Sequence, residues 1–207
     1  MVFIDFDGTI IDLWPRYCSV FNSILHLRVA VDEYRAIKQK LKKDTLVAEY
    51  FNTELPGNYF SIKRIMLEDP EFLNMDNLLF EIEILNKLLD NGVSILTKRR
   101  NKNSYLQQLK RFGIKGKSVV IDDYSKASWI EHNCDLHTNN VLIIGDSFEE
   151  LEIAKKNIGE SWMVGYGLLT KEDFDITGTP YCYYDNPILL QNALVEKVEH
   201  GNNRCDS

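Results

Sequence analysis

The chain begins with MVFIDFDGT, residues 1–9, and the rest of the sequence is organised around this stretch. The apolar residues 1–4 predict a short strand. Residues two apart on a strand point to the same side, so Asp5 and Asp7 present both carboxylates in one place where the strand ends. Gly8 then allows a sharp turn. Adjacent carboxylates favour a hard cation such as Mg²⁺ and indicate a metal-assisted phosphoryl-transfer site; an Asx-rich turn is the alternative.

Composition limits the classes of protein to which the chain belongs. Its 207 residues are 44% apolar and 27% charged, as in soluble globular proteins, and they leave room for an α/β core with an added small domain. No apolar run is long enough to cross a bilayer, and a net charge of −7 disfavours chain-wide nucleic-acid binding. We therefore expect neither a membrane nor a nucleic acid as partner.

The cysteines point to a reducing compartment. Four scattered cysteines form no Cys-x-x-Cys pair, which indicates reduced thiols. The first predicted strand begins at residue 2, so no secretory signal is expected before it. Both observations favour a cytoplasmic protein.

The hydrophobic pattern changes along the chain. Residues 14–80 show helical spacing and predict a run of helices without a strand. We expect Asp76 to cap a helix that includes Leu78 and Leu79 and ends at Asn91-Gly92. Beyond it, helices alternate with short apolar segments, which we predict to be strands, at 93–97, 119–121, 141–144, 162–164 and 181–184.

The alternation predicts an α/β fold, namely a Rossmann-like parallel sheet with helices on both faces and an inserted all-helical cap domain. We assign residues 1–13 and 81–199 to the core domain and residues 14–80 to the cap domain. Residues 200–207 are expected to form a frayed C-terminal tail.

The polar residues at the predicted strand ends converge on one place. Asp5 and Asp7 follow the first strand, Thr97 ends the second and Asp146 follows a later one, with Lys126 on the connection before it. Open parallel sheets bind ligands outside the carboxyl ends of their strands. Because several strands contribute, a chemical site is favoured over the Asx turn.

These motifs resemble the haloacid dehalogenase-like (HAD) hydrolase superfamily, especially its phosphoglycolate-phosphatase-like members with a helical C1 cap. Residues 5–9 (DFDGT) resemble motif I and residues 95–97 (ILT) resemble motif II. Lys126 resembles motif III, and residues 145–150 (GDSFEE) resemble motif IV. Lys115 and Lys117 are rivals of Lys126 as the motif III lysine. The resemblance covers most of the chain.

The resemblance implies catalytic and metal-binding roles. Asp5 would be the nucleophile that forms an aspartyl-phosphate, and Asp7 would be the general acid and then the general base. Mg²⁺ would be the cofactor, held by the carboxylates of Asp5 and Asp146 and by the backbone carbonyl of Asp7. Glu150 would hold its water shell directly or through a shifted helix.

The phosphoryl group would be bound by Gly8, Thr97, Lys98 and Lys126. Two positions depart from the family pattern. Glu150 stands where the family commonly has Asp, and Lys98 stands where Asn is common, followed by Arg99 and Arg100. One of these three cations contacts substrate, or the basic run is the solvated start of a helix; both readings remain open.

The expected function is a Mg²⁺-dependent phosphatase that hydrolyses a small-molecule phosphate monoester. A phosphomutase similar to β-phosphoglucomutase and a non-catalytic interaction module are the alternatives, whereas Asp7 disfavours carbon–halogen hydrolysis. The expected partner is a small phosphorylated metabolite, and the chain is expected to be a monomer or homodimer.

Overall fold

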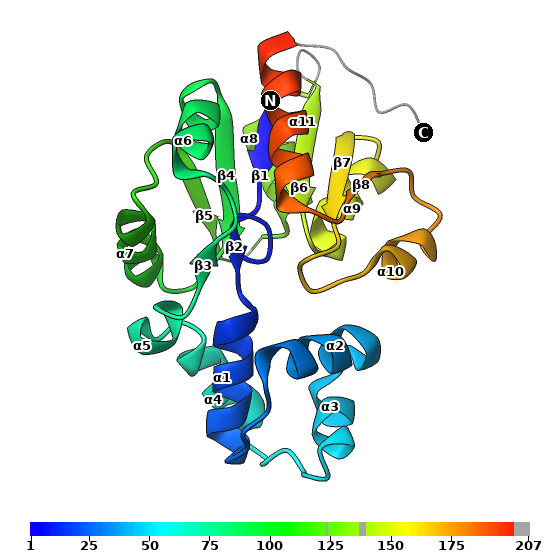
Figure 1. Ribbon diagram of the computed structural model, residues 1–207. Helices are drawn as coiled ribbons and strands as arrows, with labels where there is room; N and C mark the ends of the chain where they lie inside the picture. The colour runs from blue at the N-terminus through cyan, green and yellow to red at the C-terminus, as the bar shows by residue number, and fades with distance from the viewer. Residues whose placement is uncertain (123, 137–139, 201–207) are drawn as a thin grey trace. The chain divides into compact units, whose positions relative to one another are not determined.

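The computed structural model describes residues 1–122, 124–136 and 140–200, and the chain divides into two compact units (Figure 1). The core unit comprises residues 1–11 and the chain from Leu78 onward, and the helical unit comprises Asp12–Asn77. The sequence placed these boundaries after residues 13 and 80. Most of the predicted tail, residues 201–207, lies outside the described residues.

The core unit is built on a parallel six-stranded sheet with the order β5-β4-β1-β6-β7-β8. Its strands are β1 (Val2–Ile4), β4 (Val93–Lys98), β5 (Ser118–Ile121), β6 (Val141–Gly145), β7 (Gly159–Val164) and β8 (Cys182–Tyr184). Strand β1 pairs with β4 on one side and with β6 on the other. The strand order therefore reverses at β1, which is where open α/β sheets bind ligands.

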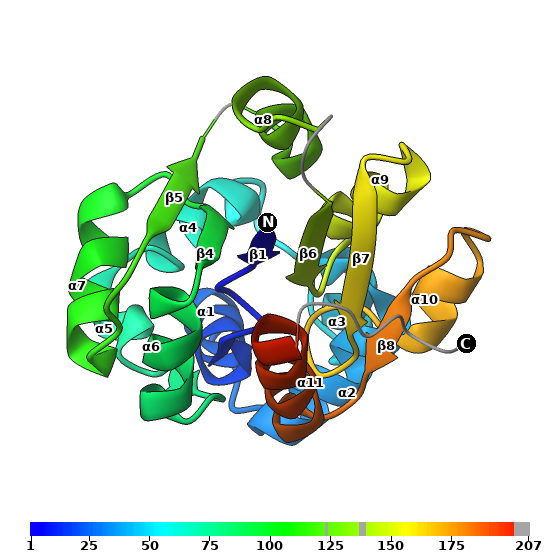
Figure 2. The same cartoon turned by 90° about the horizontal axis from the view of Figure 1, so that it is seen from above.

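Helices cover both faces of this sheet (Figure 2), which confirms the predicted fold class. Ile4 packs on the face covered by α6 (Ile82–Asp90), α7 (Lys102–Phe112) and α11 (Pro187–His200). Phe3, its neighbour in β1, packs on the other face with α8 (Lys126–Asn133) and α9 (Phe148–Lys155). Because helices cover both faces of the sheet, most residues of its strands are apolar. A short helix, α10 (Lys171–Asp175), precedes β8.

The helical unit contains five helices within residues 12–77, all of which are described. They are α1 (Trp14–Leu25), α2 (Val31–Leu41), α3 (Asp44–Tyr50), α4 (Tyr59–Met66) and α5 (Pro70–Leu73). The largest side chains of its interior are those of Trp14, Phe21, Tyr34 and Tyr59, all buried. Pro15 lies in the first turn of α1, where its missing N–H costs no hydrogen bond.

Two predictions around residue 76 are wrong. Residues 14–80 were expected to contain no strand, but β3 (Asn77–Leu78) pairs with β2 (Ile11–Asp12) in a two-stranded sheet. Asp76 does not cap a helix, because its carboxylate is buried and lies 3.1 Å from Nε of Arg16, while α6 begins only at Ile82. A short apolar run such as Leu78-Leu79 is compatible with either a strand or a helix.

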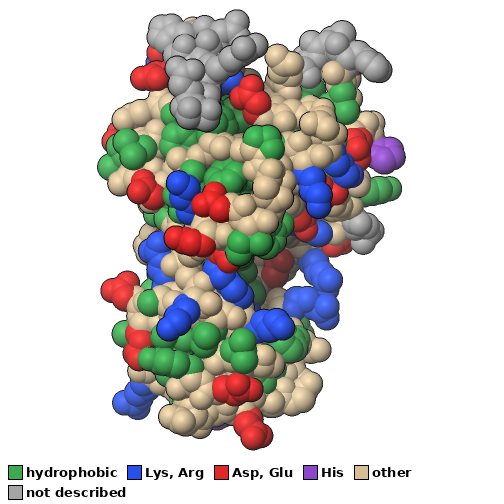
Figure 3. All heavy atoms as spheres, turned by 90° about the vertical axis from the view of Figure 1, so that its right-hand side faces the viewer, with side chains coloured by type: hydrophobic (Ala, Val, Ile, Leu, Met, Phe, Trp, Pro, Cys, Tyr) green, Lys and Arg blue, Asp and Glu red, His purple; other side chains and the backbone are tan. Residues whose placement is uncertain are grey.

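The surface shows charges of both signs. Figure 3 shows one face of the molecule, on which basic and acidic side chains are interspersed with apolar ones. In the described part of the chain, no helix is long and apolar enough to cross a membrane.

Candidate active site

The carboxyl ends of three neighbouring strands bring the predicted acidic residues and Thr97 to one edge of the sheet. Ile4, the last residue of β1, lies in register with Ile95 of β4 and Ile144 of β6. Asp5 therefore follows β1 level with Gly145, the last residue of β6, whereas β4 continues to Lys98. The N–H of Asp5 donates to the carbonyl of Ile144 over 2.8 Å. Asp5, Thr97 and Asp146 are 7%, 1% and 2% exposed, so these three side chains are largely removed from bulk water.

Lys126 lies between two buried carboxylates. Its Nζ lies 2.5 Å from Oδ1 of Asp5 and also donates to Oε1 of Glu150. Lys126 is the first residue of α8, after the capping residue Ser125. The rival candidates Lys115 and Lys117 are exposed. The structure therefore places the charge of Lys126 beside the predicted nucleophile.

Glu150 has both carboxylate oxygens engaged by the protein. Oε1 accepts from Lys126, and Oε2 accepts from the backbone N–H and the hydroxyl of Ser147 over 3.0 and 2.6 Å. The Ser147 contacts form a capping box at the start of α9. Glu150 thus holds both Lys126 and the first turn of α9 in place. Its binding to the water shell of a metal stays a prediction.

Burial and mutual repulsion shift the acidic groups. Burial raises the pKa of Asp5 to about 7, although Lys126 opposes the shift. Burial, together with the charges of Asp5 and Glu150, raises the pKa of Asp146 well above its usual range. Burial lowers the pKa of Lys126, but the two neighbouring carboxylates outweigh it and raise that pKa overall. The site thus favours a positive charge and disfavours further negative charge.

The donor set fits a divalent cation of the hard type. When Asp5, Asp146 and Glu150 are ionised, three negative charges face the single positive charge of Lys126, which leaves two negative charges. Among the described residues, no group of three or more His, Cys, Asp or Glu side chains is arranged to hold a metal. Mg²⁺ needs fewer, because it commonly takes one or two carboxylates and keeps several waters.

The carboxylate of Asp146 is held by the loop after β7. Its Oδ2 accepts from the backbone N–H of Leu168 over 2.8 Å. A Cβ added at Gly167 would lie 2.3 Å from this same oxygen, so only glycine lets the loop approach so closely. This contact was not evident from the sequence.

Asp7 is bound by an arginine. Nε and Nη2 of Arg99 lie 2.5 and 2.7 Å from Oδ2 and Oδ1 of Asp7, so the guanidinium meets both carboxylate oxygens. Arg99 is 5% exposed and follows β4 directly. A buried Arg99 is inconsistent with a fully solvated helix start, which was one reading of the basic run.

The other two cations of that run are exposed. Lys98 lies 2.9 Å from Oε1 of Glu149, and its side chain is 45% exposed. Arg100 is exposed as well. A solvated position therefore fits Lys98 and Arg100, and phosphate binding by Lys98 stays a prediction.

The turn after Asp7 has the expected backbone. Gly8 has a φ of 75°, in the region that favours glycine, and its N–H donates to the carbonyl of Ile11 over 3.1 Å. The carbonyl of Thr9 accepts from the hydroxyl of Tyr166 over 3.1 Å, which ties the turn to the loop after β7. Sequence spacing contained no signal for Tyr166.

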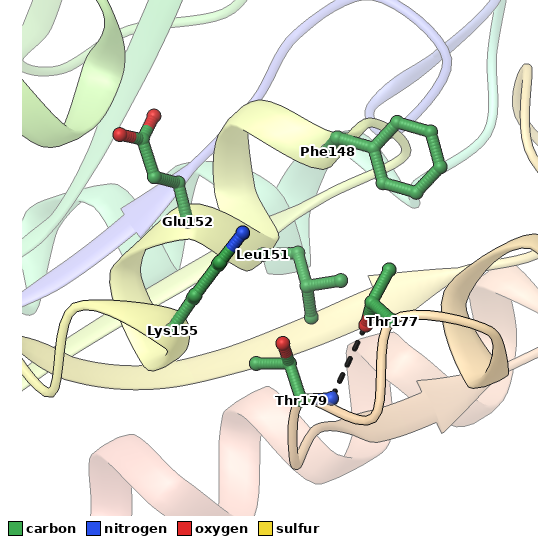
Figure 4. Close-up of a pocket in the computed structure, with 6 residues that line it drawn as sticks. All are labelled: Phe148, Leu151, Glu152, Lys155, Thr177 and Thr179. Atoms are coloured by element: carbon green, nitrogen blue, oxygen red, sulfur yellow. Dashed lines mark hydrogen bonds between the residues drawn. The ribbon is translucent and has the colours of Figure 1, made fainter.

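A separate pocket of about 390 Å³ lies between α9 and the segment that joins α10 to β8 (Figure 4). It is lined by Phe148, Leu151, Glu152, Lys155, Thr177 and Thr179. None of these residues belongs to the acidic cluster, so this pocket is distinct from the predicted site of chemistry.

Comparisons with known proteins agree on the fold. No model of a known protein family and no curated protein sequence matches this chain. Among solved structures, a haloacid dehalogenase-like family hydrolase from Streptococcus pneumoniae superposes with a TM-score of 0.65 at 17% identity, over 93% of this chain and 96% of that one.

Two further structures are similar over the same shares of chain, 93% and 96%. A predicted phosphoglycolate phosphatase from Haemophilus somnus has a TM-score of 0.66 at 16% identity. The Mycobacterium tuberculosis Protein Tyrosine Kinase A has a TM-score of 0.64 at 19% identity. Proteins with such different names share one architecture, so activity has to be argued from the site. The chain has the fold of the haloacid dehalogenase-like hydrolases.

Proposed function

We propose that this protein is a Mg²⁺-dependent phosphatase that hydrolyses a small-molecule phosphate monoester through an aspartyl-phosphate. The observation that carries the proposal is the burial of Asp5 at the sheet's switch point, beside Lys126 and Asp146. A buried carboxylate with a cation on one side and a second acidic group on the other can bring a metal and a phosphoryl group together.

The residues of the chain account for both half-reactions. In the first, a carboxylate oxygen of Asp5 attacks phosphorus, the bond from phosphorus to the leaving oxygen breaks, and Asp7 protonates that oxygen. In the second, Asp7 removes a proton from water, the water oxygen attacks phosphorus, and the bond from phosphorus to Asp5 breaks to release phosphate. Lys126, and the hydroxyl of Thr97, would stabilise the charge on the phosphoryl oxygens.

Mg²⁺ would be held by the carboxylates of Asp5 and Asp146 and the backbone carbonyl of Asp7, with Glu150 acting through water. When bound, it supplies charge neutralisation that lets an anionic nucleophile approach an anionic substrate. The raised pKa values of Asp5 and Asp146 support this assignment, because the cluster favours additional positive charge.

The first test is hydrolysis of p-nitrophenyl phosphate by the purified protein with Mg²⁺ and with EDTA. We expect activity only with Mg²⁺, and none in Asp5→Asn. A panel of phosphorylated metabolites then identifies the substrate. No hydrolysis of any member of the panel, together with no Mg²⁺ binding in a titration, would contradict the proposal and favour an interaction module.

The same assay separates a phosphatase from a phosphomutase. A mutase returns the phosphoryl group to a sugar and needs a bisphosphate primer, whereas the proposed enzyme releases inorganic phosphate without one. A small phosphorylated metabolite is the proposed substrate; cytoplasmic location and a monomeric or homodimeric state stay predictions from the sequence.

A further inference from the structure

We infer that Arg99 is a positioning residue for proton transfer by Asp7, an inference that rests on the proposed function. Arg99 lies 92 positions from Asp7 in the sequence and is brought to it because β4 pairs with β1. Its guanidinium donates from two nitrogens to the two oxygens of one carboxylate. Such a fork fixes the plane of the carboxylate as well as its distance.

Further contacts hold the guanidinium of Arg99 in place. Nη2 of Arg99 also donates to Oε1 of Gln108, on α7, over 3.0 Å. The guanidinium carbon lies 5.8 Å from the centre of the Phe6 ring, and Tyr105 of α7 packs edge-on against the same ring at 5.2 Å. Arg99 therefore has little freedom to follow Asp7 if the carboxylate rotates.

The two partners differ in their access to solvent. The Arg99 side chain is 4% exposed, whereas the Asp7 side chain is 21% exposed. The cation thus lies on the protein side of the pair, and the carboxylate keeps an open side on which a leaving oxygen or a water can approach. A residue that positions a reacting group must not occupy the site of the substrate. Arg99 meets this requirement, because it contacts Asp7 from the buried side.

Positioning matters to both proton transfers. A general acid or base has to lie within about 2.6–3.2 Å of the atom that it protonates or deprotonates. Without the fork, the Asp7 carboxylate loses the two hydrogen bonds that fix its plane. A leaving group that needs no proton, such as p-nitrophenolate, would still depart when Asp5 attacks, but the water that resolves the aspartyl-phosphate would lose its base.

The consequence is a kinetic signature that a general loss of folding does not produce. In Arg99→Gln, p-nitrophenolate should appear in a fast burst approaching one equivalent per enzyme, followed by steady-state turnover lowered by roughly 10²-fold, the lower end of the contribution of a positioned acid or base. A variant that is merely less well folded would show a smaller active fraction and no burst.

The test is a double-mutant cycle on Asp7→Asn, Arg99→Gln and the double variant, assayed with p-nitrophenyl phosphate and Mg²⁺. We expect the double variant to turn over no more slowly than Asp7→Asn alone, because Arg99 acts through Asp7. Arg100→Gln, an exposed arginine at the adjacent position, is the matched control and should retain wild-type turnover.

Two outcomes would overturn the inference. One is independent losses that multiply in the double variant, and the other is an Arg99→Gln enzyme without a burst. If Arg99→Gln does not fold, Arg99→Lys is tested in its place. Lysine keeps the positive charge but cannot bind both carboxylate oxygens as the guanidinium does, so the burst should also be seen in this variant. Failure of the proposed function is distinguishable, because wild-type protein would then release no p-nitrophenolate at all.

Discussion

The ammonium nitrogen of Lys126 lies 2.5 Å from Oδ1 of Asp5, and the same nitrogen donates to Glu150. One buried cation therefore compensates two buried carboxylates, neither of which reaches bulk water well. Removing one member of such a group leaves its partners charged and desolvated, which costs more than the group contributes when it is intact.

Lys126→Met should therefore abolish phosphatase activity and lower the free energy of unfolding by about 3–5 kcal/mol. Urea denaturation followed by circular dichroism measures the stability. Lys156→Met is the control, because Lys156 pairs with Glu131 and Glu152 at the surface and should change stability little. A Lys126→Met protein as stable as this control would contradict the ion-pair interpretation.

The stability of the metal-free protein should fall as the pH rises from about 4 to about 7. Folding raises the pKa of Asp5 from 3.8 to about 7, so in this window the native state holds a proton that the unfolded state has lost. The stabilisation that the proton on Asp5 provides is thus fully present below the pKa of Asp5 in the unfolded state. It is lost as the pH rises through the pKa of Asp5 in the folded state.

Thermal melts in EDTA and in Mg²⁺ between pH 4 and pH 8 test this effect. Mg²⁺ should stabilise the protein more as the pH rises, because the cation replaces the proton. Asp5→Asn should lose part of the pH dependence seen in EDTA, since its side chain does not titrate. In EDTA, the change in melting temperature from pH 4 to pH 7 is compared between the wild type and Asp5→Asn. If the melting temperature of the wild type rises by as much as that of Asp5→Asn, this account is wrong.

Gly167→Ala should weaken Mg²⁺ binding and activity by roughly tenfold or more, as changes around a metal ligand commonly do. The new Cβ would lie 2.3 Å from Oδ2 of Asp146, so either the carboxylate or the Leu168 loop must move. Isothermal titration with Mg²⁺ measures the loss. Gly57→Ala is the control, since a Cβ there meets nothing within 4 Å; equal affinities in the two variants would refute the prediction.

Arg16→Met should destabilise the helical unit. Arg16 is 3% exposed, lies 3.1 Å from Asp76 and donates to the carbonyl of Leu67 over 2.9 Å. The variant leaves Asp76 buried without its cation, at a cost of about 3–5 kcal/mol. Limited proteolysis and hydrogen exchange within residues 12–77 report the loss, and Arg16→Met/Asp76→Leu should recover part of it. A double variant less stable than Arg16→Met would contradict this explanation.

The sequence was sufficient to predict the strands of the core sheet, because the signals for them are local. Apolar runs such as 141–144 differ in period from the helices beside them, and each predicted strand from 93 onward overlaps an observed one. The strand-end rule likewise placed Asp5, Thr97 and Asp146 at the same edge of the sheet, because parallel strands end together.

Predictions from local sequence were wrong or incomplete for side chains whose ion-pair partners are distant in the sequence. Asp76 has the spacing of a helix cap, yet a buried arginine 60 positions earlier binds its carboxylate. Arg99 belongs to a basic run that is typical of a solvated helix start, yet strand pairing carries it to Asp7. In both cases the nearest charge in sequence is not the nearest charge in space.

By itself, the sequence determined where the six strands of the core sheet lie along the chain and which acidic groups end them, because hydrophobic period and residue type depend only on near neighbours. Only the tertiary structure decided which cation each carboxylate meets: Lys126 for Asp5 and Glu150, and Arg99 for Asp7. The physical reason is that an ion pair depends on distance and burial, which are fixed only when the sheet brings separate strands together.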